Sequence, residues 1–276
     1  MDEARPPEEG AARWDPQQYL RHAGERARPF ADLLGRVDAA GPRRVVDLGC
    51  GEGALTASLA SRWPDAEVTG VDSSAEMLAA AEAHAVPGRL AFVAGDVRDW
   101  SPAGSPLDVV VSNAVLHWVP GHAELLRRWA GWLSPGGWLA VQVPGNFRAP
   151  THALLTELCR SPEWAGRLDD VAPDPDAVLD PAAYLDVLTG AGLEADVWET
   201  TYLQVLSGRD PVLSGVSGTV LRPVLARLDE RDAAELTGQY AAALRRAYPR
   251  RPDGSTVLPF RRVFAVGHRP DGVSAG

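Results

Sequence analysis

Glycines that follow a short apolar run are the first feature of this sequence suited to holding a ligand. The run Val45 to Leu48 leads into Gly49, Gly51 and Gly53, and a helix-forming stretch comes next. Because glycine has no side chain, such a loop lets the backbone approach a ligand closely, and the start of the helix favours a negative group. We therefore expect a loop that binds a nucleotide-type cofactor, although each glycine alone also fits a simple turn.

A carboxylate follows the glycine loop at a spacing typical of nucleoside sites. Asp72 lies 19 residues beyond Gly53, at the end of the next apolar run. A carboxylate at that position can accept hydrogen bonds from both hydroxyls of a ribose, which predicts an adenosine with a free diol. Since Gly49, Gly51 and Ala54 also fit the dinucleotide pattern G-x-G-x-x-G/A, an NAD-dependent oxidoreductase stays open as an alternative at this point.

Three further polar side chains favour a ligand that carries an amino acid and an adenine. Asp47 precedes the first glycine by two residues, where it can contact an ammonium group. Asp96 ends the third expected strand, where it can accept from an adenine amine or cap a helix, and Asn113 ends the fourth. A methionine-type ligand needs these acceptors, whereas a pyrophosphate does not.

The elements that must position these residues alternate between strand and helix. Apolar runs bounded by turn residues predict strands at 43–48, 67–71, 90–94, 107–112, 138–143, 194–206 and 260–268. Helical patterns cover 15–37, 54–62, 75–85, 121–133, 181–191 and 229–248. The tetrapeptide at 134–137 reads as a tight turn, and 169–181 as a loop. This alternation predicts a doubly wound α/β fold with a mostly parallel, Rossmann-like, seven-stranded sheet.

The domain organisation follows from the same pattern. Residues 1–13, rich in Pro, Glu, Ala and Gly, predict a disordered tail, and 14–276 predict a single domain. Within it we expect a cofactor-binding core at about 43–145 and helical insertions at about 146–192 and 207–257 that form a cap on the acceptor side.

Composition excludes several classes of partner. The formal charge of −10 and a pI of about 5.1 disfavour nucleic acid and anionic membrane surfaces. No signal peptide or membrane-spanning run is present, so we expect a cytoplasmic protein. Cys50 and Cys159 lack metal-ligand spacing, which predicts neither a metal site nor a disulfide. All 27 basic residues are arginine, so any anion site must use guanidinium groups.

Taken together, the motifs resemble those of the class I S-adenosylmethionine-dependent methyltransferases. The resemblance covers about residues 43–145 and rests on D-L-G-C-G-E-G, G-V-D-S-S, G-D-V, S-N-A-V-L-H-W and S-P-G-G. It implies that the three glycines pack against the methionine part of S-adenosylmethionine, that Asp72 with Ser73 holds the ribose, and that Asp96 and Val97 flank the adenine. Met77 is implied near the adenine face, although it also fits a plain helix core.

A closer resemblance, to the trans-aconitate methyltransferases, runs nearly from end to end. It rests on W-D-P-Q-Q-Y-L-R, E-R-A-R-P-F, L-H-W-V, Q-V-P-G-N-F, W-E-T-T-Y, G-T-V-L-R-P and P-F-R-R-V-F. It implies methylation of a carboxylate oxygen of trans-aconitate or a similar small polycarboxylic acid. Because an ionised carboxylate is already a nucleophile, such a reaction needs alignment and exclusion of water rather than a general base. Another small acceptor, or cofactor binding without catalysis, stays open as an alternative.

The same resemblance suggests acceptor residues. We expect Arg222 and Arg261 to clamp carboxylates, with Arg148 as a third candidate, since a guanidinium can bind a carboxylate through two hydrogen bonds. Arg262 should face the opposite side of its strand from Arg261. Each of these arginines is otherwise a solvated surface residue.

Three side chains are expected to close the pocket over the transferred methyl group: Tyr19, His117 and Trp118. Alternatively, Tyr19 together with Arg28 holds the cofactor carboxylate, His117 is structural, and Trp118 forms core or pocket wall.

Overall fold

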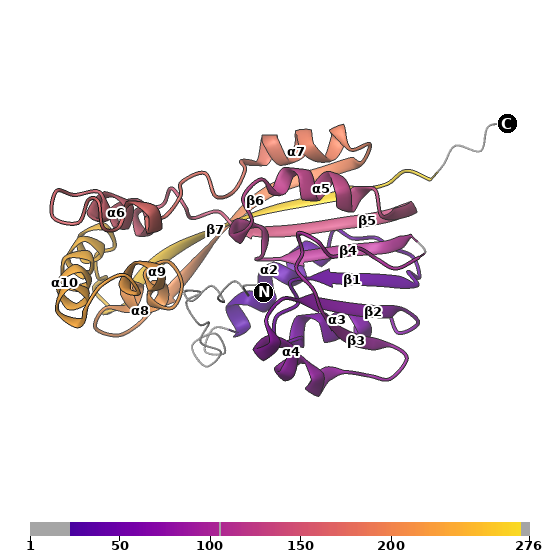
Figure 1. The fold of residues 1–276 in the computed structure, drawn as a ribbon, viewed down its shortest axis with the longest axis horizontal. Coiled ribbons are helices and arrows are strands. Elements are labelled where there is room, and N and C mark those ends of the chain that lie inside the picture. The colour runs from indigo at the N-terminus through magenta and orange to yellow at the C-terminus, as the bar shows by residue number, and fades with distance from the viewer. Residues whose placement is uncertain (1–22, 105, 272–276) are drawn as a thin grey trace, which may run out of the picture. The chain divides into compact units, whose positions relative to one another are not determined.

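The computed structural model describes residues 23–104 and 106–271 and contains a seven-stranded sheet (Figure 1). The strand order is β3-β2-β1-β4-β5-β7-β6. The strands are β1 (Arg44–Leu48), β2 (Glu67–Asp72), β3 (Leu90–Ala94), β4 (Leu107–Asn113), β5 (Leu133–Pro144), β6 (Glu194–Leu206) and β7 (Thr256–His268). Strands β1 to β5 pair in parallel and β7 pairs antiparallel to β5. The predicted doubly wound α/β fold is confirmed.

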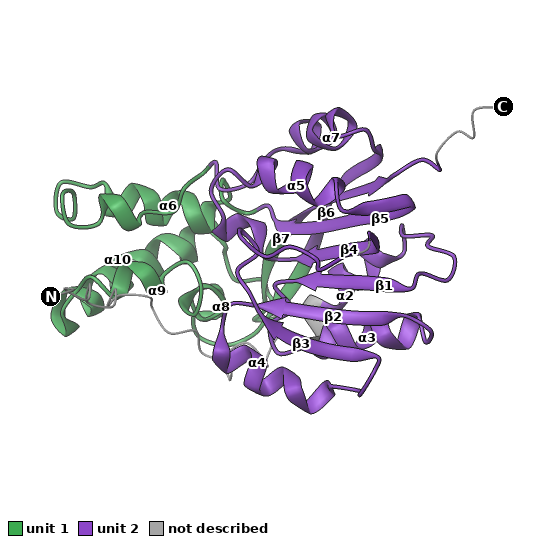
Figure 2. Ribbon diagram, turned by 45° about the vertical axis from the view of Figure 1, so that its right-hand side comes forward, with its two compact units in different colours: residues 1–23, 146–175, 203–259 green, residues 24–145, 176–202, 260–276 purple. Residues whose placement is uncertain are grey.

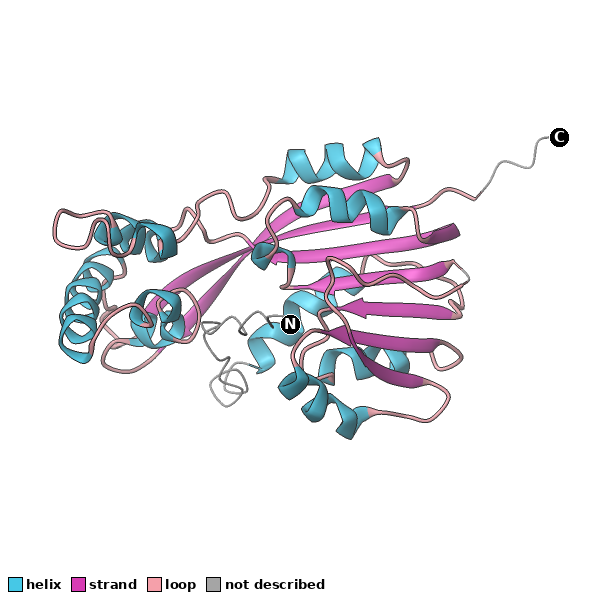
Figure 3. Cartoon of the chain, viewed as in Figure 1, coloured by secondary structure: helices cyan, strands magenta, loops and turns pink. Residues whose placement is uncertain are grey.

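Helices cover both faces of this sheet because its strands bury side chains on both sides (Figure 3). In β1, Val46 belongs to one apolar cluster and Val45 to the other. Helices α5 (His122–Ala130) and α7 (Pro181–Gly190) pack into the Val46 cluster, and α2 (Ala23–Leu34), α3 (Ala54–Arg62) and α4 (Ala75–Ala81) pack into the Val45 cluster. Burial on both faces explains why these strands read as continuous apolar runs.

The remaining helices belong to a second compact unit (Figure 2). Of the described residues, unit 2 contains 24–104, 106–145, 176–202 and 260–271, whereas unit 1 contains 23, 146–175 and 203–259. The described helices of unit 1 beyond Ala23 are α6 (Pro150–Cys159), α8 (Pro211–Ser217), α9 (Arg222–Leu225) and α10 (Glu230–Ala247). Its interior contains the buried Trp164 and Tyr240, and the Tyr240 hydroxyl donates to the Thr151 carbonyl at 2.5 Å. The expected division into one core with insertions stays a prediction.

Several predicted boundaries need correction. The turn expected at 134–137 lies inside β5, where Gly136 has a φ of +75° and the pairing with β4 shifts register. The helix expected to reach residue 133 ends at Ala130, because Leu133 pairs with Leu107 at the start of β5. The first helix ends at Leu34 rather than near Val37, and the closing strand begins at Thr256 rather than Phe260.

Short 3-10 helices account for most other differences. They cover Glu82–His84, Leu116–Trp118 and Asp169–Val171, so the helix expected to Ala85 changes type after Ala81 and the expected loop begins with a helical turn. None of the described helices combines the length and apolar composition that crossing a bilayer requires. The predicted disordered tail at 1–13 lies outside the described residues.

Candidate functional site

The glycine loop joins β1 to α3, at the edge where the parallel strands end. Gly49, Gly51 and Gly53 all have positive φ, of 83°, 55° and 81°. A Cβ on Gly49 would lie 2.2 Å from Val115, and one on Gly53 would lie 2.7 Å from Phe92, so protein packing alone requires glycine at these two positions. A Cβ on Gly51 would meet no atom within 4 Å. The backbone at Gly51 therefore faces open space that a ligand can occupy.

Asp72 connects the glycine loop to the end of β2. Its carboxylate accepts from the Gly51 amide at 2.8 Å and from the Ser74 amide at 2.9 Å. A carboxylate offers about four lone-pair positions, so two acceptor positions stay open for hydroxyl groups. Ser73 is exposed, and it is Ser74 that caps α4 by accepting from the Met77 amide at 3.2 Å.

Asp47 is the buried carboxylate of the site, with only 3% of its surface exposed. It lies on the face of β1 that carries Val45, and the Thr56 hydroxyl donates to it at 2.7 Å. Burial raises the pKa of Asp47 to about 6, because the charged form loses its hydration and the Thr56 hydrogen bond offsets only part of that cost. A cation beside Asp47 would supply the missing charge partner.

The residues expected around an adenine lie at the end of β3 and in α4. Asp96 forms an ion pair with Arg98, with distances of 2.6 and 2.9 Å, and the hydrogen bond from Arg98 lowers the pKa of Asp96. Val97 and Met77 are each 8% exposed. Their roles toward a cofactor stay predictions, and Asp96 must share its oxygens with Arg98 in any such role.

The end of β4 leads through a strained residue into the segment expected to cover the reacting groups. The Oδ1 atom of Asn113 is buried and has no hydrogen-bond partner among the described residues. Ala114 has a φ of +58°, in the left-handed region that is costly for a residue with a side chain. His117 and Trp118 then form a 3-10 turn, with ring centroids 4.7 Å apart. Trp118 is 59% exposed, so it is not a core residue of unit 2.

The three predicted acceptor arginines are divided between the units. Arg148 and Arg222 belong to unit 1, and Arg261 to unit 2. The Arg148 Nε donates to the Pro175 carbonyl at 3.4 Å, and Arg222 opens α9. Their convergence with Arg261 stays a prediction.

Arg261 has a carboxylate partner that the sequence did not reveal. Its Nε donates to Glu199 at 2.9 Å, its Nη2 contacts the same carboxylate, and its Nη1 donates to the Gly145 carbonyl at 3.2 Å. Glu199 stands 62 residues away in sequence, on the neighbouring strand, so only the pairing of β6 with β7 could have revealed it. An acceptor carboxylate would have to displace or share this partner.

Side chains of α2 and β6 form a second cluster in unit 2. The Tyr202 hydroxyl donates to Asp32 at 2.5 Å, and the Arg28 guanidinium lies 5.0 Å from the Tyr202 ring centroid. Arg262 is buried over the Phe260 ring, whereas Arg261 pairs with Glu199, so these consecutive arginines have different partners, as strand alternation predicts. Tyr19 lies outside the described residues, so its proposed roles, including the pairing with Arg28, stay predictions.

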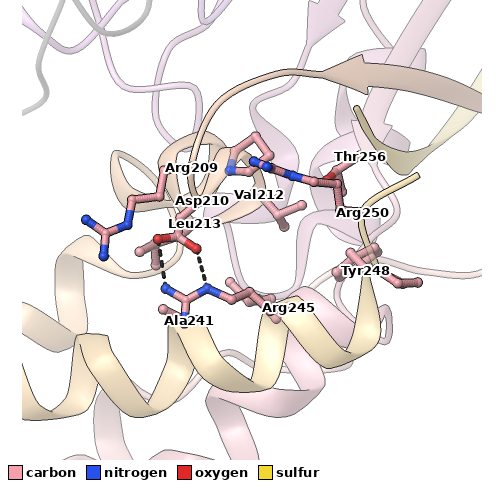
Figure 4. Close-up of a pocket in the computed structure, with 12 residues that line it drawn as sticks. Arg209, Asp210, Val212, Leu213, Ala241, Arg245, Tyr248, Arg250 and Thr256 are labelled. Atoms are coloured by element: carbon pink, nitrogen blue, oxygen red, sulfur yellow. Dashed lines mark hydrogen bonds and ion pairs between the residues drawn. The ribbon is translucent and has the colours of Figure 1, made fainter. Parts of the chain in front are cut away.

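A cavity of about 420 Å³ lies within unit 1, between the start of α8 and the end of α10 (Figure 4). Asp210 accepts two hydrogen bonds from Arg245, at 2.6 and 2.9 Å, beside Arg209 and Arg250. None of the predicted site residues within the described ranges lines this cavity.

Comparison with known proteins identifies relatives of this chain. A model described as "Methyltransferase domain" matches residues 45–137. A trans-aconitate 2-methyltransferase of Streptomyces avermitilis is 56% identical, covering 93% of this chain and 97% of the relative. Another protein of the same name, from Streptomyces coelicolor, is 54% identical, covering 95% of this chain and 88% of the relative. The crystal structure of the YcgJ protein from Bacillus subtilis matches with a TM-score of 0.58 at 13% identity, covering 89% of this chain and all of that one, which supports the fold.

Proposed function

We propose, because the chain belongs to the trans-aconitate 2-methyltransferase family, that it transfers a methyl group from S-adenosylmethionine to a carboxylate oxygen of trans-aconitate. Membership of this family confirms the predicted enzyme class. It leaves the oxidoreductase alternative without support, since the relatives and the matching domain are methyltransferases. The observation that carries the proposal is the identity of more than half over nearly the whole chain, which extends beyond the cofactor core into the segments that carry the acceptor arginines.

The residues present fit the cofactor. S-adenosylmethionine supplies an electrophilic methyl group on a sulfonium centre and carries an ammonium group. Gly51 leaves space for a ligand against the backbone; an ammonium group would give the buried Asp47 carboxylate a cationic partner and the Asn113 Oδ1 atom a hydrogen-bond donor. Asp72 retains acceptor positions for the ribose hydroxyls.

The task of the protein is then to place and desolvate the acceptor carboxylate. No proton has to be removed from an ionised carboxylate, so we assign His117 to the wall of the site rather than to base catalysis. We propose that Tyr19 and the exposed Trp118 close over the reacting groups and exclude water.

Arg261 is our first candidate for holding a non-reacting carboxylate, and Arg222 and Arg148 are the further candidates. The Arg261 guanidinium is about one-third exposed and binds the carboxylate of Glu199, so an acceptor carboxylate would bind it by exchange with, or beside, that partner. On the cofactor side, we propose that Ser73 acts with Asp72 at the ribose and that Asp96, Val97 and Met77 lie against the adenine.

A direct transfer assay tests the proposal. Purified protein incubated with methyl-labelled S-adenosylmethionine and trans-aconitate should give a labelled monomethyl ester. The same assay with other di- and tricarboxylates, phenols and amines sets the selectivity. If phenols or amines accept the label and trans-aconitate does not, the proposed acceptor is wrong while the enzyme class stands.

We also propose that the protein works in the cytoplasm. Its two cysteines, Cys50 and Cys159, are buried free thiols, which a reducing compartment preserves.

A further inference from the structure

A buried glutamine on β5 has no function in the site described so far. Gln142 is 1% exposed, and its Nε2 atom has no hydrogen-bond partner among the described residues. It interrupts an apolar strand, between Val141 and Val143, near the carboxyl end. A buried amide donor without a partner opposes folding, and such groups are rare in native proteins. The presence of this glutamine in the buried strand therefore needs an explanation.

A second amide with an unsatisfied atom lies directly beside it. Gln142 pairs in register with Asn113 of β4, whose buried Oδ1 also lacks a partner. The two side chains share a face, since neighbouring residues in register on parallel strands point the same way. One of them offers a donor and the other an acceptor, yet no hydrogen bond joins them. The pair is therefore set to bind a group that presents both an acceptor and a donor, or two adjacent groups.

The backbone fixes the position of this amide pair. The Ala114 amide donates to the Gln142 carbonyl at 2.8 Å, and Ala114 holds its left-handed conformation there. Strain at a residue of this kind persists only where its surroundings determine it, and it concentrates at functional sites. The backbone thus places Asn113 and Gln142 side by side at the end of the sheet, with Asn113 shortly before the turn that carries His117 and Trp118.

The amide pair lies on the same face of the sheet as the buried Asp47. Asp47 pairs in register with Val111, and Val111 lies two residues before Asn113 on β4. The order β1-β4-β5 then places Asn113 nearer the glycine loop and Gln142 one strand further away, about 4.8 Å per strand. A ligand bound along this edge would meet Asp47, Asn113 and Gln142 in that order.

We propose that Gln142 is a specificity-determining residue that donates its Nε2–H to a carboxylate of the methyl acceptor, while Asn113 Oδ1 accepts from the cofactor ammonium. This inference rests on the proposed function. A neutral donor suits this place because it orients a carboxylate without the strong charge pairing that would hold the reacting oxygen away from the methyl group. The arginines remain available for the other carboxylates.

Two substitutions of Gln142 test the assignment. Gln142→Met keeps the length of the side chain and removes the donor, so the KM for trans-aconitate should rise at least about tenfold, the effect of one hydrogen bond to a charged group. Gln142→Glu places a carboxylate against the acceptor and should raise the KM further. In both variants the Kd for S-adenosylhomocysteine, measured by calorimetry, should stay within about twofold of wild type, because the proposed contacts of that ligand are with Asn113 and Asp47 and not with Gln142.

A matched control separates a binding role from a structural one. Gln239 bonds Trp164 at 3.2 Å and Glu163 at 2.9 Å, so Gln239→Met breaks real hydrogen bonds and should lower the melting temperature with an unchanged KM. Gln142→Met should show the reverse, an equal or higher melting temperature of the ligand-free protein with a raised KM.

The outcomes distinguish this inference from the proposed function. If wild type forms no ester with trans-aconitate, the proposed function fails and this inference fails with it. If wild type is active and Gln142→Met has an unchanged KM, the inference alone is overturned. A lowered melting temperature with unchanged KM shows a structural role, and a weakened Kd for S-adenosylhomocysteine with unchanged acceptor KM moves Gln142 to the cofactor; both overturn the assignment made here.

Discussion

Replacing Asp47 by asparagine should make the ligand-free protein more stable and the cofactor complex weaker. The carboxylate is buried, and its pKa is raised from 3.8 to about 6 chiefly by loss of hydration. At about 1.4 kcal/mol for each pH unit, the charged form costs the native state about 3 kcal/mol at pH 7.5. Asparagine retains an oxygen that can accept from Thr56, so Asp47→Asn should raise the free energy of unfolding by up to about that amount.

The sign of the pH dependence follows from the same values. Between pH 4 and pH 6 the native state holds a proton on Asp47 that the unfolded state has released, so this group makes the protein more stable as the pH falls through that range. Wild type and Asp47→Asn should therefore differ by about 3 kcal/mol at pH 7.5 and converge near pH 4. Urea unfolding followed by circular dichroism across this range measures the difference.

Cofactor binding should respond in the opposite direction. An ammonium group next to Asp47 needs the ionised carboxylate, so the Kd of wild type for S-adenosylhomocysteine should rise about tenfold for each pH unit below about 6. Asp47→Asn should lose about 10- to 150-fold in affinity at pH 7.5, the effect of a hydrogen bond to a charged group, and lose the pH dependence. Asp65→Asn makes the same chemical change at an exposed position and should alter neither quantity. Equal unfolding free energies of wild type and Asp47→Asn at pH 7.5 would refute the reasoning.

Three other predictions concern the loop, the acceptor and the acid limit of stability. Gly51→Ala should raise the Kd for S-adenosylhomocysteine more than tenfold and cost about 1–2 kcal/mol of stability from its positive φ, whereas Gly49→Ala should cost more stability because its Cβ meets Val115. Calorimetry measures the Kd and urea unfolding the stability; similar effects of both substitutions on both quantities would contradict a ligand at Gly51. Arg261→Ala should raise the KM for trans-aconitate about tenfold or more with little change in cofactor Kd, as steady-state kinetics would show, and kinetics equal to wild type would exclude it from the acceptor site. Burial lowers the pKa of His152 to about 4, so this group reduces stability as the pH falls from 6.5 toward 4, and His152→Gln should flatten the acid limb of the unfolding curve; an unchanged limb would contradict this.

Local patterns predicted the bounds of several elements well. The bounds of α3, β3 and β6 agree with the sequence-based ranges, because each segment has a clear period and is bounded by turn residues. The pair of Asp96 with Arg98 is also local, and two residues of separation could have revealed it. Local patterns do not predict pairing across the sheet. The register shift between β4 and β5, which includes residues 133–137 in β5, is an example.

The environment of the candidate acceptor residues could not be predicted, because it depends on contacts between residues far apart in the sequence. Arg261 was selected by motif, but its partner Glu199 becomes visible only when β6 and β7 lie side by side. Gln142 belongs to the motif Q-V-P-G-N-F, and a polar residue inside an apolar strand is itself a signal in the sequence. What distinguishes Gln142 from a surface glutamine is that its buried amide nitrogen has no hydrogen-bond partner among the described residues, and a sequence alone does not show this.

Polar groups at the two ends of the sheet have different environments, and this difference supports the proposed position of the site. Asp108, near the amino end of β4, accepts three hydrogen bonds that outweigh its burial, so its pKa is lowered. At the carboxyl ends of β1, β4 and β5, in contrast, Asp47 has a raised pKa, Ala114 is strained, and the amides of Asn113 and Gln142 lack partners. Each of these features costs the ligand-free fold free energy. Because a charged or polar ligand would offer partners to Asp47, Asn113 and Gln142, binding of cofactor and acceptor at this end should stabilise the fold.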